Sequence, residues 1–539
     1  MRCEEVEAVV SGHDVVPQLD PDRRAALNAA FHLVEDVQTP AVEQARRAIR
    51  EALTIAEHAG WPETIATLMY AEAVDAITNL PDLAAEACRR LIERSEALSE
   101  PAMLAAGLTI RAELALRDGD VVRHGADCAR ALVLLDTAAE PISRASALIS
   151  AGVSYEALSL WELGDELYTR AELLLPECDD QLLRPVIELN RGLAWFWWTA
   201  ALLEAGETER AEQLLRDRTE DPTLDLPASW ALELRVSRLA RLTLLNAADP
   251  TEIEELRELG ARLDLHYREL EWLARMQVHL ALAHDSIRTG RLADAAAQAA
   301  AAEELTRIQG TVYQRSFAHW TATLVEQRQN PDIGQATRTY ASVLARQRWD
   351  ERLGRLAAAR EQIESERLRG QHEGLVRRTL EDPLTGLGNR RALEQRLDRD
   401  RAELADDGPV AMLIVDVDEF KAVNDAYGHA VGDQVLCRVG EILRSVLRMD
   451  DLALRLGGDE FCAVVTGAPA DAVQQRADQI GALVLLEDWS AIQPGLRVSV
   501  SVGLACARGP AGVDDIYPRA DAALYAAKAA GSGLQRIAH

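Results

Sequence analysis

A repeat runs through roughly the first 330 residues of the chain, and it limits the possible folds sharply. Turn-forming residues recur about every 40 to 45 residues, flanked by helical stretches rich in Ala and Leu. The turn positions are Thr39-Pro40, Asn79, Asp118-Gly119, Gly164-Asp165, Gly206-Glu207, Asp249-Pro250, Gly290 and Asn330-Pro331. A single helix pair cannot bury its own apolar face. We therefore predict an all-α solenoid of stacked helix pairs.

This array resembles a divergent tetratricopeptide repeat with long units, although no unit carries the full consensus. The resemblance implies a sensor or interaction domain over residues 1–336, with an unknown protein or peptide ligand in a concave groove. The aromatic run at residues 195–198, WFWW, has two interpretations. These rings either line the groove or pack between neighbouring helices.

Composition restricts the partners and the compartment. The 539 residues are too many for one core, and a hydrophobic fraction of 48% supports two or more packed domains. A net charge of −30 argues against nucleic acid, whose binding depends on Lys and Arg. The acidic start "MRCEEVEAVV" is unlike a secretory signal, and no apolar run is long enough to cross a membrane. We expect a cytoplasmic protein that binds neither nucleic acid nor membrane.

Residues 337–380 are charged and helical, and they are expected to link two domains. Their apolar residues are spaced as in a short, imperfect coiled coil. Trp349, Leu353, Leu356 and Ile363 fit the a and d spacing, and Arg360 and Arg367 are expected at intervening core positions. Leu368, Leu375 and Val376 follow in a shifted register. The alternative is a single amphipathic connector that lies on the solenoid.

Residues 381–539 alternate between predicted helices and strands in the order βαββαβ. This order predicts an α/β (α+β) domain with an antiparallel sheet and helices on one face. The segment "LALRLGGDEFCAVV", residues 452–465, predicts a hairpin, because paired glycines accept the positive φ of a tight turn.

Acidic residues gather at the expected turn and at the end of the buried strand over residues 410–417. Asp459 and Glu460 lie at the turn, Asp416 ends the strand, and Asp418 follows it. Carboxylates that converge at strand ends form a hard-oxygen site for Mg²⁺, completed by substrate phosphates. Two such ions can clamp the attacking and leaving oxygens of a phosphoryl transfer. The alternative is a solvated turn with no ligand.

The motifs "DPLTGLGNRR", "DVDEFKAVNDAYGHAVGDQVL" and "RLGGDEF" follow one another in residues 381–539. Together they resemble the GGDEF domain of diguanylate cyclases, which has a palm-like fold. The resemblance implies condensation of two GTP into cyclic di-GMP (c-di-GMP) and two pyrophosphates by a homodimer. It also implies two Mg²⁺ or Mn²⁺ ions in each active site.

The resemblance assigns a role to each matching position. Lys421 and Lys528, the two lysines of the chain, match the positions that hold the β- and γ-phosphates. The implied catalytic residues are Asp459, Glu460 and Asp416, and the implied metal ligands are Asp416, Val417 through its carbonyl, and Asp459. The implied substrate-binding residues are Asn424 and Asp433 for guanine, Lys421 and Lys528 for phosphate, and Phe420, Gly457 and Gly458.

Arg448 and Asp451 match the RxxD motif at which c-di-GMP inhibits the family, and Arg476 is a further contact. One position departs from the family, because Ser532 stands where an arginine usually contacts phosphate. Arg536 is a candidate substitute. The departure keeps open an alternative function, a catalytically weak receptor that binds GTP or c-di-GMP and signals through the repeat domain.

Overall fold

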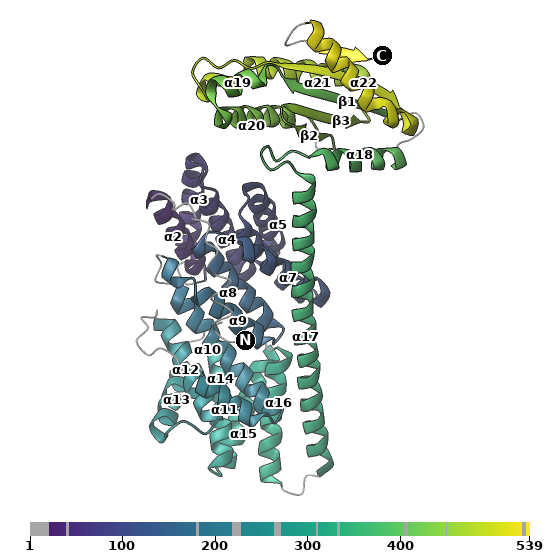
Figure 1. Ribbon diagram of the computed structural model, residues 1–539. Helices are drawn as coiled ribbons and strands as arrows, with labels where there is room; N and C mark the ends of the chain where they lie inside the picture. The colour runs from purple at the N-terminus through teal and green to yellow at the C-terminus, as the bar shows by residue number, and fades with distance from the viewer. Residues whose placement is uncertain are drawn as a thin grey trace. The chain divides into compact units, whose positions relative to one another are not determined.

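The computed structural model describes residues 21–38, 42–178, 183–217, 228–263, 271–308, 311–330, 335–403, 408–448, 450–530 and 535–538. The chain divides into two compact units, one ending at Arg367 and the other beginning at Leu368 (Figure 1). Within the described ranges, no helix is both long enough and apolar enough to cross a membrane.

The first unit is helical in its described residues. Pro stands in the first turn of α4, α5, α6 and α8, where its missing N–H costs nothing. The helices before α17 are α2 Pro21–Asp36, α3 Val42–Ala59, α4 Pro62–Asn79, α5 Pro81–Leu98, α6 Pro101–Arg117, α7 Val121–Thr137, α8 Pro141–Ala157, α9 Trp161–Glu172, α10 Leu183–Glu204, α11 Thr208–Asp217, α12 Ala228–Leu244, α13 Pro250–Leu263, α14 Glu271–Arg288, α15 Leu292–Ile308 and α16 Val312–Gln329, with a 3-10 turn, η1, at Leu175–Glu177.

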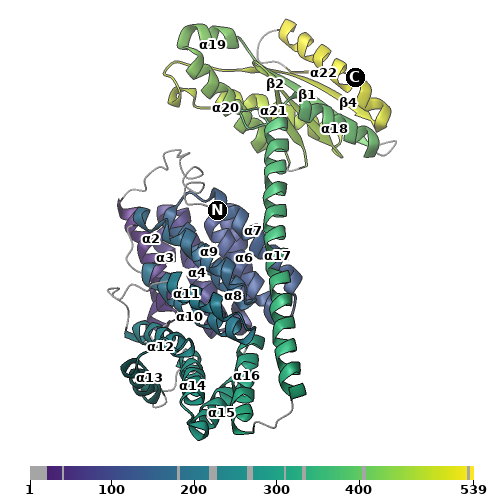
Figure 2. The ribbon, with the colours of Figure 1, turned by 60° about the horizontal axis from the view of Figure 1, so that its bottom comes forward.

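From α2 to α14, each even-numbered helix packs against the even-numbered helix that follows it in the chain. These helices form one continuous layer made of α2, α4, α6, α8, α10, α12 and α14 (Figure 2). The helices between them pack against their neighbours in this layer. Trp195, Phe196 and Trp197 are at most 8% exposed within the second of two large cores. These rings therefore pack between helices. The kinship of the array to tetratricopeptide repeats stays a prediction.

Helix α17, Gln335–Leu380, lies along the array in its first part, up to Arg367. Trp349 and Ile363 are 2% and 7% exposed and belong to the two cores of the array, where Leu356 also packs. The expected heptad apolar residues thus contact the array, as the connector interpretation requires. Pairing with a second copy stays a prediction.

The intervening positions on this buried face differ from the expected ones. Arg352 is fully buried and Ala359 packs against the first core, whereas the side chain of Arg360 is 52% exposed. The buried face therefore follows residues 349, 352, 356, 359 and 363, with alternating steps of three and four. Placing Arg360 in the core was wrong, because one residue on a helix rotates a side chain by about 100°.

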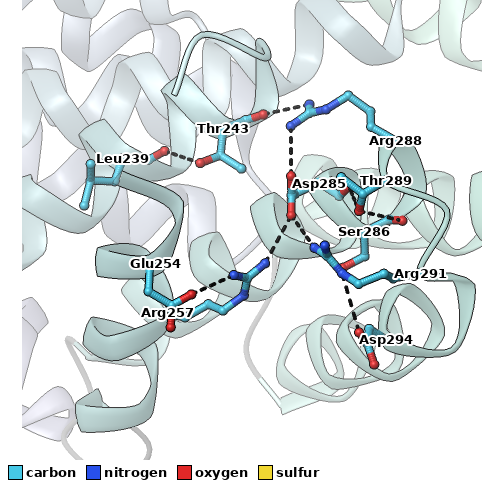
Figure 3. A network of polar contacts seen from close by, with 10 residues as sticks. All are labelled: Leu239, Thr243, Glu254, Arg257, Asp285, Ser286, Arg288, Thr289, Arg291 and Asp294. Carbon is cyan, nitrogen blue, oxygen red and sulfur yellow. Dashed lines mark hydrogen bonds and ion pairs between the residues drawn. The ribbon is translucent and has the colours of Figure 1, made fainter. Parts of the chain in front are cut away.

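Asp285 of α14 ties several helices of the array together (Figure 3). Its carboxylate is 6% exposed and lies 3.2 Å from Arg257 of α13, 3.6 Å from Arg288 and 2.6 Å from Arg291. Arg288 also donates to the Thr243 carbonyl of α12 at 2.8 Å. Three guanidiniums thus compensate one buried carboxylate, which stabilises the relative placement of α12, α13 and α14.

The second unit is built on a five-stranded sheet in the order β2-β3-β1-β4-β5. Strand β1 is antiparallel to both β3 and β4, and β2 is antiparallel to β3. Strand β5 pairs with β4 in parallel, so the sheet is antiparallel only in its first four strands. The strands are β1 Pro409–Val417, β2 Leu452–Gly457, β3 Glu460–Thr466, β4 Val500–Arg508 and β5 Gln535–Ala538.

Helices cover both faces of this sheet, which corrects the prediction that they lie on one. Leu413 and Val415 of β1 pack in one core with α20 and α21, while Met412 and Ile414 pack in another with α18 and α22. Alternate residues of a strand point to opposite faces, and β1 is apolar at nearly every position. The helices are α18 Arg390–Glu403, α19 Phe420–Tyr427, α20 His429–Val446, α21 Ala470–Leu486 and α22 Gly509–Ala530, with a 3-10 turn, η2, at Trp489–Ala491.

Candidate functional site

The end of β1 lies beside the hairpin turn between β2 and β3. Asp416 pairs across the sheet with Glu460 of β3 and with Ser501 of β4. The next residue, Val417, donates its backbone N–H to the Asp459 carbonyl at 3.2 Å. The central position of β1 therefore brings the three acidic residues to one end of the sheet.

The turn itself depends on glycine. Gly457 and Gly458 adopt φ of 146° and 55°, both in the region that side chains disfavour. A Cβ at either position would meet no atom within 4 Å, so the space above the turn is open. A flat ligand can approach the turn backbone there without a side chain in the way.

Arg455 braces this turn from β2, and sequence analysis did not single it out. Its guanidinium donates to the Gly458 carbonyl at 2.9 and 2.7 Å and pairs with Asp382 at 3.2 Å. Burial opposes ionisation of Asp382, but hydrogen bonds from Thr385 and the charge of Arg455 lower the pKa of Asp382 below its ordinary value. The segment "DPLTGLGNRR", which contains Asp382 and Thr385, thus supports the turn. The polar residues of this motif were the sequence feature that could have predicted such a support.

Lys528 of α22 reaches the same end of the sheet. Its Nζ lies 2.7 Å from Oδ1 of Asp416, whose side chain is 6% exposed. Burial raises the pKa of Asp416 above its ordinary value, and Asp459 and Glu460 add to the rise while Lys528 opposes it. The site concentrates negative charge around one nearly buried carboxylate.

These residues fit a small divalent cation. A cation beside Asp416 would stabilise its charged form and relieve its repulsion with Asp459 and Glu460. Among the described residues, no group of three or more His, Cys, Asp or Glu side chains is arranged to hold a metal ion. A Mg²⁺ shell here would need backbone and substrate oxygens besides the carboxylates, as this ion commonly uses.

Asp418 lies just past the end of β1 and has a different environment. Its two carboxylate oxygens accept hydrogen bonds from the hydroxyls of Ser499 and Ser501, both at 2.6 Å. Its backbone N–H donates to the Ser499 carbonyl at 3.0 Å. These contacts join the start of α19 to β4, so Asp418 positions the loop that follows β1.

The expected guanine-binding residues lie on α19 and α20. Asn424 has a buried Oδ1 that finds no hydrogen-bond partner in the described part of the chain. A Cβ added to Gly432 of α20 would come within 2.0 Å of that oxygen. Gly432 therefore makes room for the side chain of Asn424. The glycine in "HAVGDQVL" is the sequence feature that could have predicted this close contact. Asp433 and Lys421 are exposed, and Phe420 is half-buried.

The three residues of the RxxD prediction lie together. Asp451 has a nearly buried carboxylate that accepts from Arg476 at 2.6 Å and from the Arg448 backbone N–H at 2.9 Å. A cavity of about 510 Å³ opens beside Asp451 and is also lined by Arg396 and Arg399. Ser532 and the side chain of Arg536 lie outside the described residues.

Residues 379–533 match the family model described as "Diguanylate cyclase, GGDEF domain". The chain is 33% identical over 191 residues to diguanylate cyclase DgcP of Pseudomonas aeruginosa, covering 34% of this chain and 28% of that protein. It is 44% identical over 156 residues to an uncharacterised protein encoded in the hutH 5′ region of Streptomyces griseus, covering 28% and 62%. It is 35% identical over 170 residues to diguanylate cyclase DgcS of Shewanella oneidensis, covering 31% and 55%. The chain thus spans less than two thirds of each relative.

Among solved structures, the coiled coil and GGDEF domain of DgcB from Caulobacter crescentus, in complex with c-di-GMP, is similar at 33% identity. The similarity covers 34% of this chain and 98% of that one, with a TM-score of 0.31.

Proposed function

We propose that this chain, whose residues 379–533 match the GGDEF domain of diguanylate cyclases, condenses two GTP into c-di-GMP and two pyrophosphates. The observation that carries the proposal is the meeting of Asp416, Asp459 and Glu460 with Lys528 at one end of the sheet. This arrangement supplies oxygen ligands for cations and a positive charge for phosphate within a single site.

Asp416 and Asp459, with the Val417 carbonyl, would hold two Mg²⁺ or Mn²⁺ ions, and Glu460 lies beside them. When bound, these ions would polarise the reacting phosphate and lower the pKa of the attacking hydroxyl. Lys528 has a 45% exposed side chain, so its ammonium can leave Asp416 and neutralise a phosphate when a cation takes its place. Lys421 on α19 is exposed and would also bind the β- and γ-phosphates.

Specificity for guanine is proposed to come from α19 and α20. The buried Oδ1 of Asn424 accepts a hydrogen bond from a purine N–H, which would satisfy the atom that otherwise has no partner. Asp433 is exposed and accepts from the N1 and N2 donors that guanine has and adenine lacks. Gly457 and Gly458 leave the turn backbone open to the nucleotide, and Phe420 borders the base.

The reaction is symmetric, because each GTP must present its 3′-hydroxyl to the α-phosphorus of the other. One catalytic domain that binds one GTP therefore cannot finish the reaction. Two copies facing each other across a two-fold axis would provide the geometry, so the active form is proposed to be a homodimer.

Arg448, Asp451 and Arg476 are proposed to bind the product c-di-GMP and inhibit the enzyme. The carboxylate of Asp451 is already positioned by Arg476 and borders a cavity that Arg399 also lines, while Arg396 on the same cavity is paired with Asp400. Guanidiniums suit phosphate and the guanine acceptor edge, and a carboxylate suits the guanine donors.

The helical array is proposed to regulate the cyclase by binding a protein or peptide. A cavity of about 490 Å³ runs along its continuous layer, between α2 and α12. Its walls combine apolar and polar side chains, including Tyr70, Ile110, Arg117, Ser150 and Asn190. An extended peptide needs both kinds of contact, for its side chains and for its backbone.

Purified protein incubated with GTP and Mg²⁺ tests the catalytic proposal. We expect c-di-GMP from the wild type, none above background from Asp459→Ala, and unchanged product from the control Asp471→Ala on α21. Equal product from wild type and Asp459→Ala would overturn the site. Binding of GTP or c-di-GMP with no turnover at any protein concentration would favour the receptor alternative.

A further inference from the structure

Five arginines of α17 bind the array through carboxylates on other helices or turns. The pairs are Arg346 with Glu207, Arg348 with Glu204, Arg352 with Glu162, Arg360 with Glu166, and Arg367 with Asp136. The pairs of Arg346, Arg360 and Arg367 have side chains that are 25–53% exposed, and solvent-exposed pairs contribute little to stability. The contacts that hold α17 in place are therefore the buried ones near its middle.

Arg352 is the centre of these buried contacts and is 0% exposed. Its guanidinium carbon lies over two indole rings, 4.8 Å from the ring centroid of Trp161 and 4.5 Å from that of Trp349. Its Nε donates to the Ser159 carbonyl at 2.7 Å, and it pairs with Glu162 of α9. A buried guanidinium with two aromatic faces and a carboxylate is stable only while all of them stay together.

The same face of α17 carries the heptad spacing. Trp349, Leu356 and Ile363 are seven residues apart, and all three pack on the array. Beyond Arg367 two apolar side chains are instead exposed, Leu368 at 57% and Val376 at 41%, and the side chain of Leu375 lies outside the described residues. This exposed end, up to Leu380, is shorter than two heptads, whereas a stable coiled coil takes about three or four.

We propose that docking of α17 on the array and pairing of α17 with a second copy are mutually exclusive, so that docking holds the enzyme inactive. The proposal rests on the cyclase function and on its need for two copies. The apolar face formed by Trp349, Leu356 and Ile363 can pack either on the array or on a second copy of α17, but not on both. Only when this face leaves the array is the apolar stripe of α17 long enough for a stable coiled coil. The contact of Arg352 with Trp161 and Glu162 sets the stability of the docked state.

Glu162→Gln tests this, because it weakens docking and leaves the sequence of α17 unchanged. Removal of one member of a buried ion pair costs enough to raise the dimer association constant roughly tenfold or more. We expect sedimentation velocity to show more dimer and c-di-GMP formation to rise at low protein concentration. The matched control is Glu166→Gln on the same helix, whose pair with Arg360 is 53% exposed on the glutamate side and should change neither quantity.

The reverse variant locks the docked state. A Cβ at Gly125 of α7 would lie 2.8 Å from the side-chain oxygen of Gln362, so cysteines at both positions can be joined by a short bis-methanethiosulfonate cross-linker. We expect the cross-linked Gly125→Cys/Gln362→Cys protein to remain monomeric and to lose activity roughly tenfold or more, with recovery in reductant. Wild type treated in the same way controls for the native cysteines.

The outcomes separate this proposal from the cyclase function. If Glu162→Gln dimerises as wild type does and the cross-linked protein dimerises and turns over fully, the exclusive contact is wrong. If Glu162→Gln forms more dimer and the cross-linked protein stays monomeric, but no protein forms c-di-GMP, the exclusive contact stands and the proposed function fails. A Glu162→Gln protein that does not fold leaves the decision to the cross-linked variant.

Discussion

The ammonium of Lys528 lies 2.7 Å from the carboxylate of Asp416, so a proposed phosphate ligand neutralises a proposed metal ligand. Lys528 comes from α22 and Asp416 from the end of β1, 112 residues earlier in the chain. A divalent cation and this ammonium compete for the same carboxylate. Loading of the metal would therefore free Lys528 for the phosphates of the nucleotide.

This competition predicts opposite effects of Lys528→Met on metal and on substrate. We expect tighter Mn²⁺ binding, measured by electron paramagnetic resonance, because the competing cation is gone. We also expect kcat/KM for GTP to fall roughly 10–100-fold, because a charged contact to phosphate is lost. Parallel weakening of both would contradict the competition and indicate a general loss of structure, which circular dichroism would detect.

Gly432→Ala is predicted to disturb guanine binding. The new methyl group would lie 2.0 Å from Oδ1 of Asn424 and must displace that side chain. We expect KM for GTP to rise roughly tenfold or more with a smaller effect on kcat. The matched control is Gly440→Ala on the same helix, where the nearest atom is 3.4 Å away. Equal KM values for the two variants would remove Asn424 from the site.

Asp285→Asn is predicted to destabilise the helical array. The substitution removes the charge that compensates Arg257, Arg288 and Arg291, whose side chains are 30–42% exposed and can partly hydrate. We expect a loss of about 1–3 kcal/mol in the free energy of unfolding, measured with urea. Asp294→Asn, at a carboxylate that is 67% exposed, should change it by less than about 0.5 kcal/mol.

Acid is predicted to destabilise the array through His284. The imidazole packs against Phe317 and Trp320 with centroids 5.6 and 5.5 Å away, and burial with the nearby Arg288 lowers its pKa from 6.5 to about 4. Between about pH 4 and 6.5, the unfolded state therefore binds a proton at His284 that the folded state does not bind. The contribution of neutral His284 to the free energy of unfolding is fully present above pH 6.5 and is lost as the pH falls toward 4.

His284→Phe isolates this effect, since it keeps an aromatic ring in place. Over that pH range we expect the wild type to lose about 3 kcal/mol more than the variant. Thermal unfolding of both proteins between pH 7 and 4 measures the difference. Identical pH dependence in both would mean that folding does not shift the pKa of His284.

The candidate site shows which parts of a fold the sequence alone can predict. Asp416 and Asp459 were expected at neighbouring strand ends, and the backbone hydrogen bond between Val417 and Asp459 brings them there. Arg455, Ser499 and Ser501 were not anticipated. Their roles depend on which carbonyl or carboxylate lies opposite, and this follows from the order of strands in the sheet. The face covered by α18 and α22 was missed for the same reason.

Local patterns in the chain determined the helical repeat, the tight hairpin turn and the acidic cluster, because periodicity, glycine conformation and charge are properties of neighbouring residues. Only the tertiary structure decided where the apolar face of α17 is buried. A heptad pattern shows that a helix has an apolar face. Which surface buries that face depends on how well segments distant in the sequence compete for it. Here the array covers Trp349 and Ile363, and that choice carries the proposed regulation.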